Sequence, residues 1–256
     1  DSSTSRGLGD VYKRQVDDFS DLFGMNAAGT DAKMRNTKES ILEAQFTSGA
    51  GNWCTWMFGR DLVNWNNNFT WAKWVTPSRD LISAFKQEGD EVRFKESIVY
   101  YDCNWSNYYP SDNYPFMYKC RSANSSIIKY RYADVLLLKA EALIMQDTPD
   151  LEGAADIIDK VRDRAKLGAL PTSVRSNKNA MLNALLKERR LELAFEGQRW
   201  FDLVRLDKVE EVMNAVYAKD SGRKAQIYTF DKNSYRLPIP QSVIDANDKI
   251  HQNPGY

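Results

Sequence analysis

The feature that most constrains the fold is the stretch Glu188–Leu203, which mixes charged and large apolar residues at helical spacing. On a helix from about Asn179 to Glu196, three leucines fall on one apolar stripe: Leu182, Leu186 and Leu193. Arg189 lies within this stripe. It must therefore be paired, because burial of an isolated charge is costly. Gly197 is suited to end the helix in a left-handed conformation.

We predict that the charges of this stretch form a structural ion network between packed helices. Its expected members are Arg189, Glu192, Glu196, Arg199 and Asp202. The competing interpretation makes Glu188 and Glu192 a catalytic acid pair, as in a glycosidase. That pair would need an open cleft and a raised pKa on one carboxyl group, and ion pairing of both groups between helices would exclude it. The structural interpretation is favoured, so we predict no catalytic residue and no enzymatic activity.

The same stretch resembles the signature of the SusD/RagB family of surface nutrient-binding lipoproteins from the outer membrane of Bacteroidetes-type bacteria. Two further segments agree with this resemblance. Tyr130–Ala142 is similar to the helix that precedes the signature, and Leu237–Tyr256 is similar to the C-terminus of the family. The resemblance extends from about Glu39 to Tyr256 and is weakest between Trp53 and Trp74.

The resemblance implies a mostly α-helical protein that binds an extracellular glycan or oligosaccharide at the cell surface. It implies delivery of that ligand to a SusC-like TonB-dependent transporter of the outer membrane. This chain is similar to the C-terminal half of the family. We therefore expect membrane attachment only through a lipid anchor outside this sequence, and location at the extracellular face of the outer membrane. The alternative function is a helical scaffold that binds a protein or peptide.

Periodicity predicts three regions. Residues 1–15 are small, polar and charged, and we expect a non-native leader there. Residues 16–126 are expected to be a loop-rich, aromatic-rich region with few short strands, among them Ser40–Phe46 and Ile98–Cys103. Residues 127–256 are expected to form a helical C-terminal region similar to that of the family, with tetratricopeptide-like helices from about 127 to 218. Within them, Tyr130–Gln146 is apolar nearly all round and should be buried, while Lys139 could join the ion network.

The most unusual composition lies between Trp53 and Trp74, where five of the seven tryptophans occur beside Asn and Arg side chains. Asn104–Pro115 is a second aromatic-rich loop. Aromatic rings can stack on sugar faces while amides and charges bind the hydroxyl groups; the same rings could instead cap a core. We predict ten ligand-binding residues: Trp53, Trp56, Arg60, Trp65, Asn66, Asn67, Trp71, Trp74, Trp105 and Tyr108.

Composition excludes several classes of function. The chain has 35 basic and 35 acidic residues, so its charge favours neither nucleic acid nor an anionic membrane surface. Its single histidine, His251, excludes a multi-histidine metal site. Cys54, Cys103 and Cys120 lack metal-ligand spacing, and their odd number leaves at most one disulfide within the chain. We therefore predict no metal and no cofactor.

Overall fold

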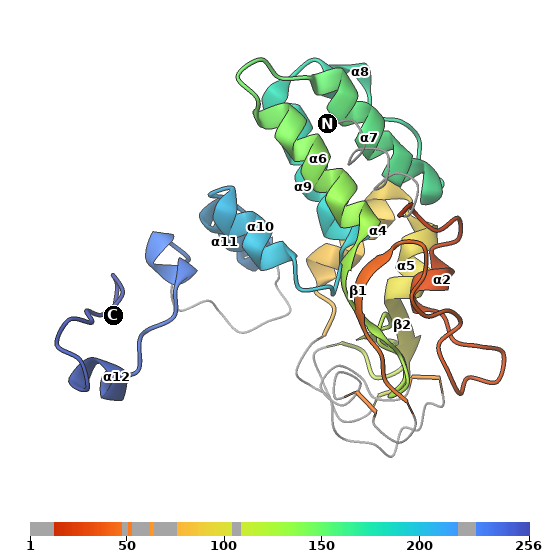
Figure 1. Cartoon of the computed structure of the whole chain (residues 1–256), viewed down its shortest axis with the longest axis horizontal. Coiled ribbons are helices and arrows are strands. Elements are labelled where there is room, and N and C mark those ends of the chain that lie inside the picture. The colour runs from red at the N-terminus through yellow and green to blue at the C-terminus, as the bar shows by residue number, and fades with distance from the viewer. Residues whose placement is uncertain (1–12, 48–50, 53–61, 64–75, 104–108, 220–228) are drawn as a thin grey trace, which may run out of the picture. The chain divides into compact units, whose positions relative to one another are not determined.

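The computed structural model describes residues 13–47, 51–52, 62–63, 76–103, 109–219 and 229–256. The chain packs as two compact units, Asp1–Gly197 and Gln198–Tyr256. Helices dominate the described residues and the strands are few and short, which confirms the predicted fold class (Figure 1).

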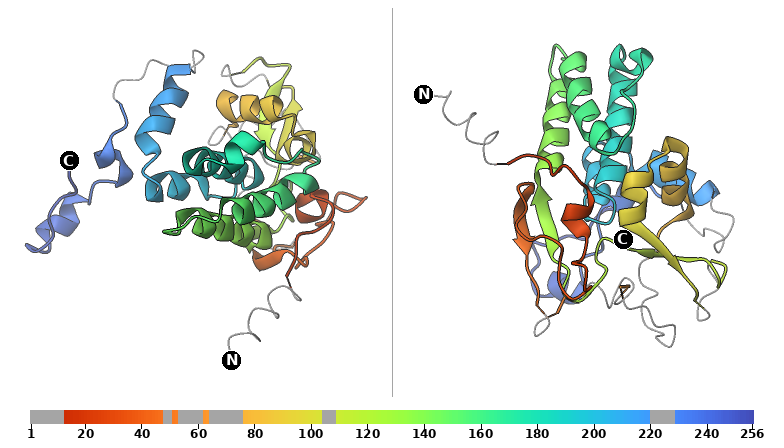
Figure 2. Two further views of the ribbon diagram at one scale, coloured as in Figure 1. Left: turned by 90° about the horizontal axis from the view of Figure 1, so that it is seen from above. Right: turned by 90° about the vertical axis from the view of Figure 1, so that its right-hand side faces the viewer.

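The first unit is built on three helices that lie side by side (Figures 1 and 2). They are α6 (Tyr132–Met145), α7 (Leu151–Arg164) and α9 (Lys178–Glu192), joined by the short α8 (Thr172–Arg175). Small residues let α6 and α7 approach closely, and their shared core contains Ala140, Ala154 and Ala155. Asp150 and Asn177 cap α7 and α9 through their side chains, which accept hydrogen bonds from Gly153 N and Ala180 N.

One face of α6 differs from the prediction. The helix was expected to be buried on all sides, but Val135, Leu138 and Met145 are 44%, 42% and 53% exposed. The reason is that α7 and α9 pack on the opposite face, which carries Leu137, Ala140 and Ile144. Lys139 is also exposed, so the expectation that it joins the buried ion network is wrong.

The end of α9 also differs from the prediction, because the helix ends at Glu192 and not at Glu196. The carbonyl of Glu192 accepts hydrogen bonds from Lys119 Nζ at 2.9 Å and Arg131 Nη2 at 2.7 Å. These side chains take the place of the helical N–H of Glu196, which donates to Leu193 O instead. Gly197 is left-handed as predicted, but Phe195 also has a positive φ of 65°.

Two further helices pack beside α9. Helix α4 (Arg79–Glu88) begins with a cap by Ser78 and ends at the left-handed Gly89. Helix α5 (Glu91–Ser97) follows at once, with Asp90 as its cap. Phe85 and Ile98 of this region share a core with Leu191 of α9.

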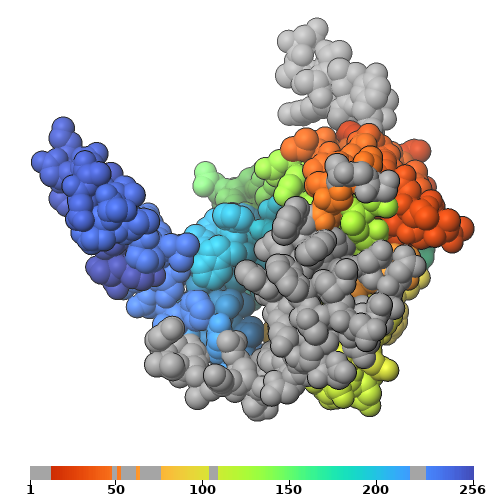
Figure 3. Space-filling model, turned by 90° about the horizontal axis from the view of Figure 1, so that it is seen from below, coloured from red at the N-terminus to blue at the C-terminus, as the bar shows by residue number. Residues whose placement is uncertain are grey.

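Two antiparallel strand pairs complete the unit. Strand β1 (Ser40–Ala44) pairs with β4 (Ile127–Arg131), and β2 (Ile98–Tyr101) pairs with β3 (Tyr114–Met117). Tyr114 was predicted to lie in a loop but is buried in β3. A short helix, α2 (Ser20–Phe23), was missed because its polar surroundings hide a buried cluster with Phe19. Both α2 and β1 belong to the segment 13–47, which is coloured orange-red in Figure 3.

The second unit holds α10 (Arg199–Arg205), α11 (Val209–Lys219), a 3-10 turn at Lys232–Tyr235 and α12 (Gln241–Asp245). The Asn214 side chain fastens α11 to the later chain, because its amide donates to Phe230 O and accepts from Phe230 N, each at 2.9 Å. None of the helices in the described ranges has the length and apolar character needed to span a membrane.

Candidate functional site

The ten predicted ligand-binding residues all lie outside the described residues, so their role stays a prediction. They fall in three segments, 53–61, 64–75 and 104–108, which we call the aromatic segments. The structure does describe the residues that flank each segment. The candidate site is therefore built from these flanking residues and from the framework that holds them.

The flanking residues attach to a single framework, which we call the platform: the β2–β3 strand pair and the following segment 118–125. Leu62 and Val63 separate the first two aromatic segments. Leu62 is fully buried with Cys103, Tyr114 and Phe116 of the platform region. Its N–H donates to Arg121 O at 2.7 Å, and its carbonyl accepts from the Tyr101 hydroxyl at 2.5 Å. Burial and these two bonds fix the chain between the two segments.

Asn52 fixes the start of the first aromatic segment. Its backbone N–H donates to Ala123 O at 2.9 Å. Its side-chain amide donates to three carbonyl oxygens at 2.7–3.1 Å, which belong to Ser122, Ala123 and Ser125. An asparagine that is buried and used in this way positions backbone rather than binding a ligand.

The end of the second segment and the end of the third meet the platform close to each other. The hydroxyl groups of Thr76 and Tyr114 are 3.0 Å apart, and the Tyr109 hydroxyl donates to Pro77 O at 2.8 Å. The Arg79 guanidinium lies 4.6 Å from the centre of the Tyr109 ring. Since Tyr109 and Tyr114 are also in edge contact, these residues hold both segments in one place.

A buried ion cluster lies in the same unit and is centred on Glu192. The Glu192 carboxylate binds three guanidinium groups, those of Arg93, Arg131 and Arg164. These arginines come from α5, the end of β4 and the end of α7. The carboxylate and two of the three arginines are at most 1% exposed. One side chain of α9 therefore joins four elements of the fold.

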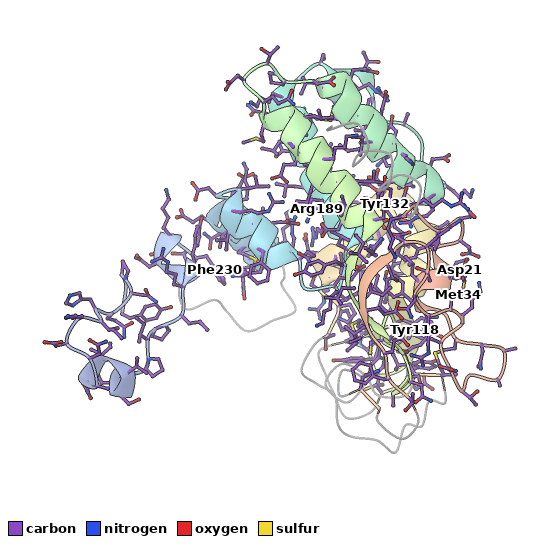
Figure 4. All side chains as sticks on the ribbon, viewed as in Figure 1. Asp21, Met34, Tyr118, Tyr132, Arg189 and Phe230 are labelled. Carbon is purple, nitrogen blue, oxygen red and sulfur yellow. The ribbon has the colours of Figure 1, made fainter. Side chains whose placement is uncertain are left out.

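Further charges complete this cluster. Glu39 binds Arg131 at 2.8 Å and Arg164 at 2.5 Å, and also accepts from Val16 N. Glu196 binds Arg131 at 2.7 Å and Lys119 at 2.6 Å. The cluster thus ties the N-terminal segment and the platform to α9. Figure 4 labels Arg189 of α9 and Tyr132, the first residue of α6, near one end of the helical layer.

The pKa values follow from burial and from these partners. Burial raises the pKa of Glu192, but the charges of Arg164, Arg131 and Arg93 outweigh it and hold the pKa well below the ordinary range. The same balance lowers the pKa of Glu196. Burial lowers the pKa of Lys119 to about 8, although Glu196 opposes this shift. Burial raises the pKa of Glu188 against the charge of Arg93.

The catalytic alternative for Glu188 and Glu192 does not hold. Glu188 binds Arg93 of α5 at 2.6 Å and Arg162 of α7 at 3.2 Å, while Glu192 binds the three arginines named above. Both carboxylates are buried, at 2% and 0% exposure. Ion pairing of both between helices is the condition that excludes this acid pair.

Of the predicted network members, the printed contacts place Glu192 and Glu196 in this cluster. Arg189 binds Asp134 of α6 at 2.8 Å, a partner that was not expected. Asp202 binds Arg205 at 2.8 Å within α10. Sequence reasoning missed most of the partners, among them Glu39, Arg93, Lys119, Arg131 and Arg164. A usable signal existed for two of them, because Arg93 and Arg131 each stand between large apolar neighbours.

The described residues do not suggest a metal centre. Within them, no group of three or more His, Cys, Asp or Glu side chains is arranged to hold a metal ion. Cys103 and Cys120 are both buried. Cys54 lies outside the described residues.

Comparison with known proteins places the chain in a family. The model of the SusD family matches residues 118–256, more than half of the chain. The chain belongs to the SusD family. It is 35% identical to the SusD-like protein P2 of Formosa agariphila over 143 residues, which cover 53% of this chain and 27% of that protein.

Solved structures share the fold. A SusD superfamily protein from Parabacteroides distasonis superposes with a TM-score of 0.71 at 21% identity, covering 99% of this chain and 56% of that one. A laminarin-binding SusD-like protein superposes with a TM-score of 0.64 at 25% identity, covering 96% and 54%. The chain therefore spans only part of the length of the SusD-family proteins that it matches.

Proposed function

We propose that this chain binds an extracellular glycan or oligosaccharide at the cell surface, without breaking bonds in it. The aromatic segments would stack on sugar faces, and the amides and charges beside them would bind hydroxyl groups. Membership of the SusD family supports this proposal, as does the similarity to a solved protein that is described as laminarin-binding.

The observation that carries the proposal is the common attachment of the aromatic segments. Residues that flank all three, namely Asn52, Leu62, Thr76, Cys103 and Tyr109, bond or pack within the platform region. A loop-built sugar site needs loops whose ends are held together, because ordering them on binding would otherwise reduce the affinity. The platform supplies that preorganisation in advance.

Delivery to a SusC-like TonB-dependent transporter and location at the outer face of the outer membrane, through a lipid anchor, belong to the same proposal. They are supported by family membership.

A second candidate function is the binding of a protein or peptide partner. It is favoured by the exposed apolar stripe on α6, where Val135, Leu138 and Met145 recur at helical spacing. This function predicts no affinity for polysaccharides, so one experiment separates the two.

That experiment is affinity electrophoresis of the chain against a panel of soluble polysaccharides that includes laminarin. In a gel that contains a polysaccharide bound by the unaltered chain, we expect the migration of Trp65→Ala and of Trp71→Ala to be slowed less than that of the unaltered chain. Phe201→Ala is the matched control, because it removes an aromatic ring that is 67% exposed and outside the aromatic segments. If no polysaccharide slowed the unaltered chain, glycan binding would be contradicted. If a polysaccharide slowed both tryptophan variants as much as the unaltered chain, the site would lie elsewhere.

A further inference from the structure

A polar hollow lies beside the platform. It encloses about 360 Å³ and is walled by the loop 24–29, Lys33, Val63, Glu96, Tyr118 and Arg121. Its walls thus come from the N-terminal segment, the end of α5 and the platform. Among the described residues that line the hollow, none belongs to the ion cluster. Tyr118 and Asp21, which lies close to Lys33, are labelled in Figure 4.

The hollow adjoins the aromatic segments through Val63. This residue lies between segments 53–61 and 64–75, and it forms part of the wall. Gly29 lies so close to Val63 that a Cβ atom at Gly29 would be 2.7 Å from Val63 Cγ1. Gly29 also has a φ of +67°, which favours glycine. Both observations require glycine where the loop meets the junction of the two segments.

The loop that forms the outer wall is held in place. Asn26 Oδ1 accepts from Thr30 N at 2.9 Å and closes the loop on itself. Asn124 Nδ2 donates to Thr30 O at 2.7 Å and fastens it to the platform. The wall therefore exists before any ligand binds.

Arg121 and Glu96 both line the hollow and carry a hydrogen-bond donor and an acceptor. Arg121 Nη2 binds Glu96 Oε2 at 2.8 Å, and Arg121 Nε donates to Tyr118 O at 3.0 Å. Within the described part of the chain, the other nitrogen, Nη1, and the other oxygen, Glu96 Oε1, form no hydrogen bond. A paired guanidinium and carboxylate with one spare donor and one spare acceptor match two adjacent hydroxyl groups, each of which can donate or accept.

The charges around the hollow are compensated. Lys33 binds Asp21 at 2.6 Å, and Arg121 is matched by Glu96. A ligand with its own net charge would disturb these pairs, whereas a neutral one would not. The chemistry therefore favours a neutral polyhydroxyl group over an acidic one.

We propose that this hollow is a subsite for one neutral sugar residue with two adjacent free hydroxyl groups, within the glycan that the chain is proposed to bind. The subsite rests on the proposed function, because it extends the same glycan site. Arg121 donates to one hydroxyl group and Glu96 accepts from its neighbour.

The test fills the hollow without disturbing its walls. Ala28 is an exposed loop residue that lines the hollow, so Ala28→Trp adds a large side chain there. Ala246→Trp is the matched control, since Ala246 is exposed in the other compact unit. Both variants and the unaltered chain are run against the polysaccharide panel, and their thermal unfolding midpoints are compared to show that they fold equally.

We expect Ala28→Trp to bind the polysaccharide about tenfold more weakly than the unaltered chain does, which corresponds to about 1.4 kcal/mol. Ala246→Trp is expected to leave binding unchanged. Unchanged binding by Ala28→Trp, while Trp71→Ala still loses it, would overturn the subsite and leave the glycan function standing. Binding of no polysaccharide by the unaltered chain would overturn both.

Discussion

The buried ion cluster and the platform both connect distant parts of the chain, but they do so in different ways. The cluster joins α5, α7, α9 and β4 through charged side chains that are almost fully buried, with Glu192 at its centre. The platform holds the chain beside the aromatic segments through apolar burial and neutral hydrogen bonds, as at Leu62. Buried ion pairs therefore fix the framework, while apolar burial and neutral hydrogen bonds supply most of the contacts that hold the chain beside the aromatic segments.

The largest expected effect comes from breaking the cluster at its centre. Glu192→Gln keeps the size of the side chain but leaves three buried guanidinium groups without their shared carboxylate. Loss of one partner of a buried ion pair costs about 3–5 kcal/mol, and we expect a decrease of that order in the free energy of unfolding, measured by urea denaturation.

The matched control is Glu211→Gln, which removes an ion pair to Lys208 where the glutamate side chain is 67% exposed. Exposed pairs contribute about 0–1 kcal/mol, so its unfolding curve should nearly overlay that of the unaltered chain. Equal effects of the two substitutions would show that Glu192 is not the centre of the framework.

A smaller effect is expected from breaking the platform. Leu62→Ala opens a cavity next to Tyr114 and Phe116, and such substitutions cost about 2–5 kcal/mol. Leu62 separates two aromatic segments. We therefore also expect the folded variant to bind the polysaccharide more weakly than the unaltered chain does.

If folded Leu62→Ala bound the polysaccharide with unchanged affinity, the platform would not organise the aromatic segments. Circular dichroism of the variant at the temperature of the binding experiment checks that it is folded.

The smallest expected effect is on the pH dependence of stability. The folded state holds the pKa of Glu196 below its ordinary value of 4.5. Below pH 4.5, the Glu196 carboxyl group is therefore protonated to a greater extent in the unfolded chain than in the folded chain. The contribution of Glu196 is complete above pH 4.5 and is lost as the pH falls toward the folded pKa.

We therefore expect Glu196→Gln to be less stable than the unaltered chain at pH 7, with a gap that narrows below pH 4.5. Urea denaturation at several pH values measures this gap. A gap independent of pH would mean that Glu196 is not held ionised by Arg131 and Lys119. Glu188, whose pKa is raised by burial, acts in the opposite direction in both proteins and cancels in the difference.

Local features of the fold could be predicted from the sequence because each depends on neighbouring residues. Ser78 and Asn177 cap α4 and α9, and Gly89 ends α4 in a left-handed conformation. These positions need only a short polar side chain before an apolar period, or a glycine after it.

The partners in the cluster could not be predicted, because they are set by packing between distant segments. Arg93, Arg131 and Arg164 lie 99, 61 and 28 residues from Glu192. Helical periodicity shows that Glu192 faces inward but carries no information about which helix it meets. The end of α9 was missed for the same reason, since Lys119 and Arg131 take the carbonyl of Glu192.

The separation of framework from binding surface is tested by measuring stability and glycan binding together in two variants. Trp71→Ala and Glu192→Gln would each be examined by urea denaturation and by calorimetry with the polysaccharide that the panel identifies. We expect Trp71→Ala to lose binding with little change in stability. We expect Glu192→Gln to lose stability but to bind normally where it is folded. The reverse pattern, with stability lost in Trp71→Ala and binding lost in folded Glu192→Gln, would contradict the separation of framework from binding surface.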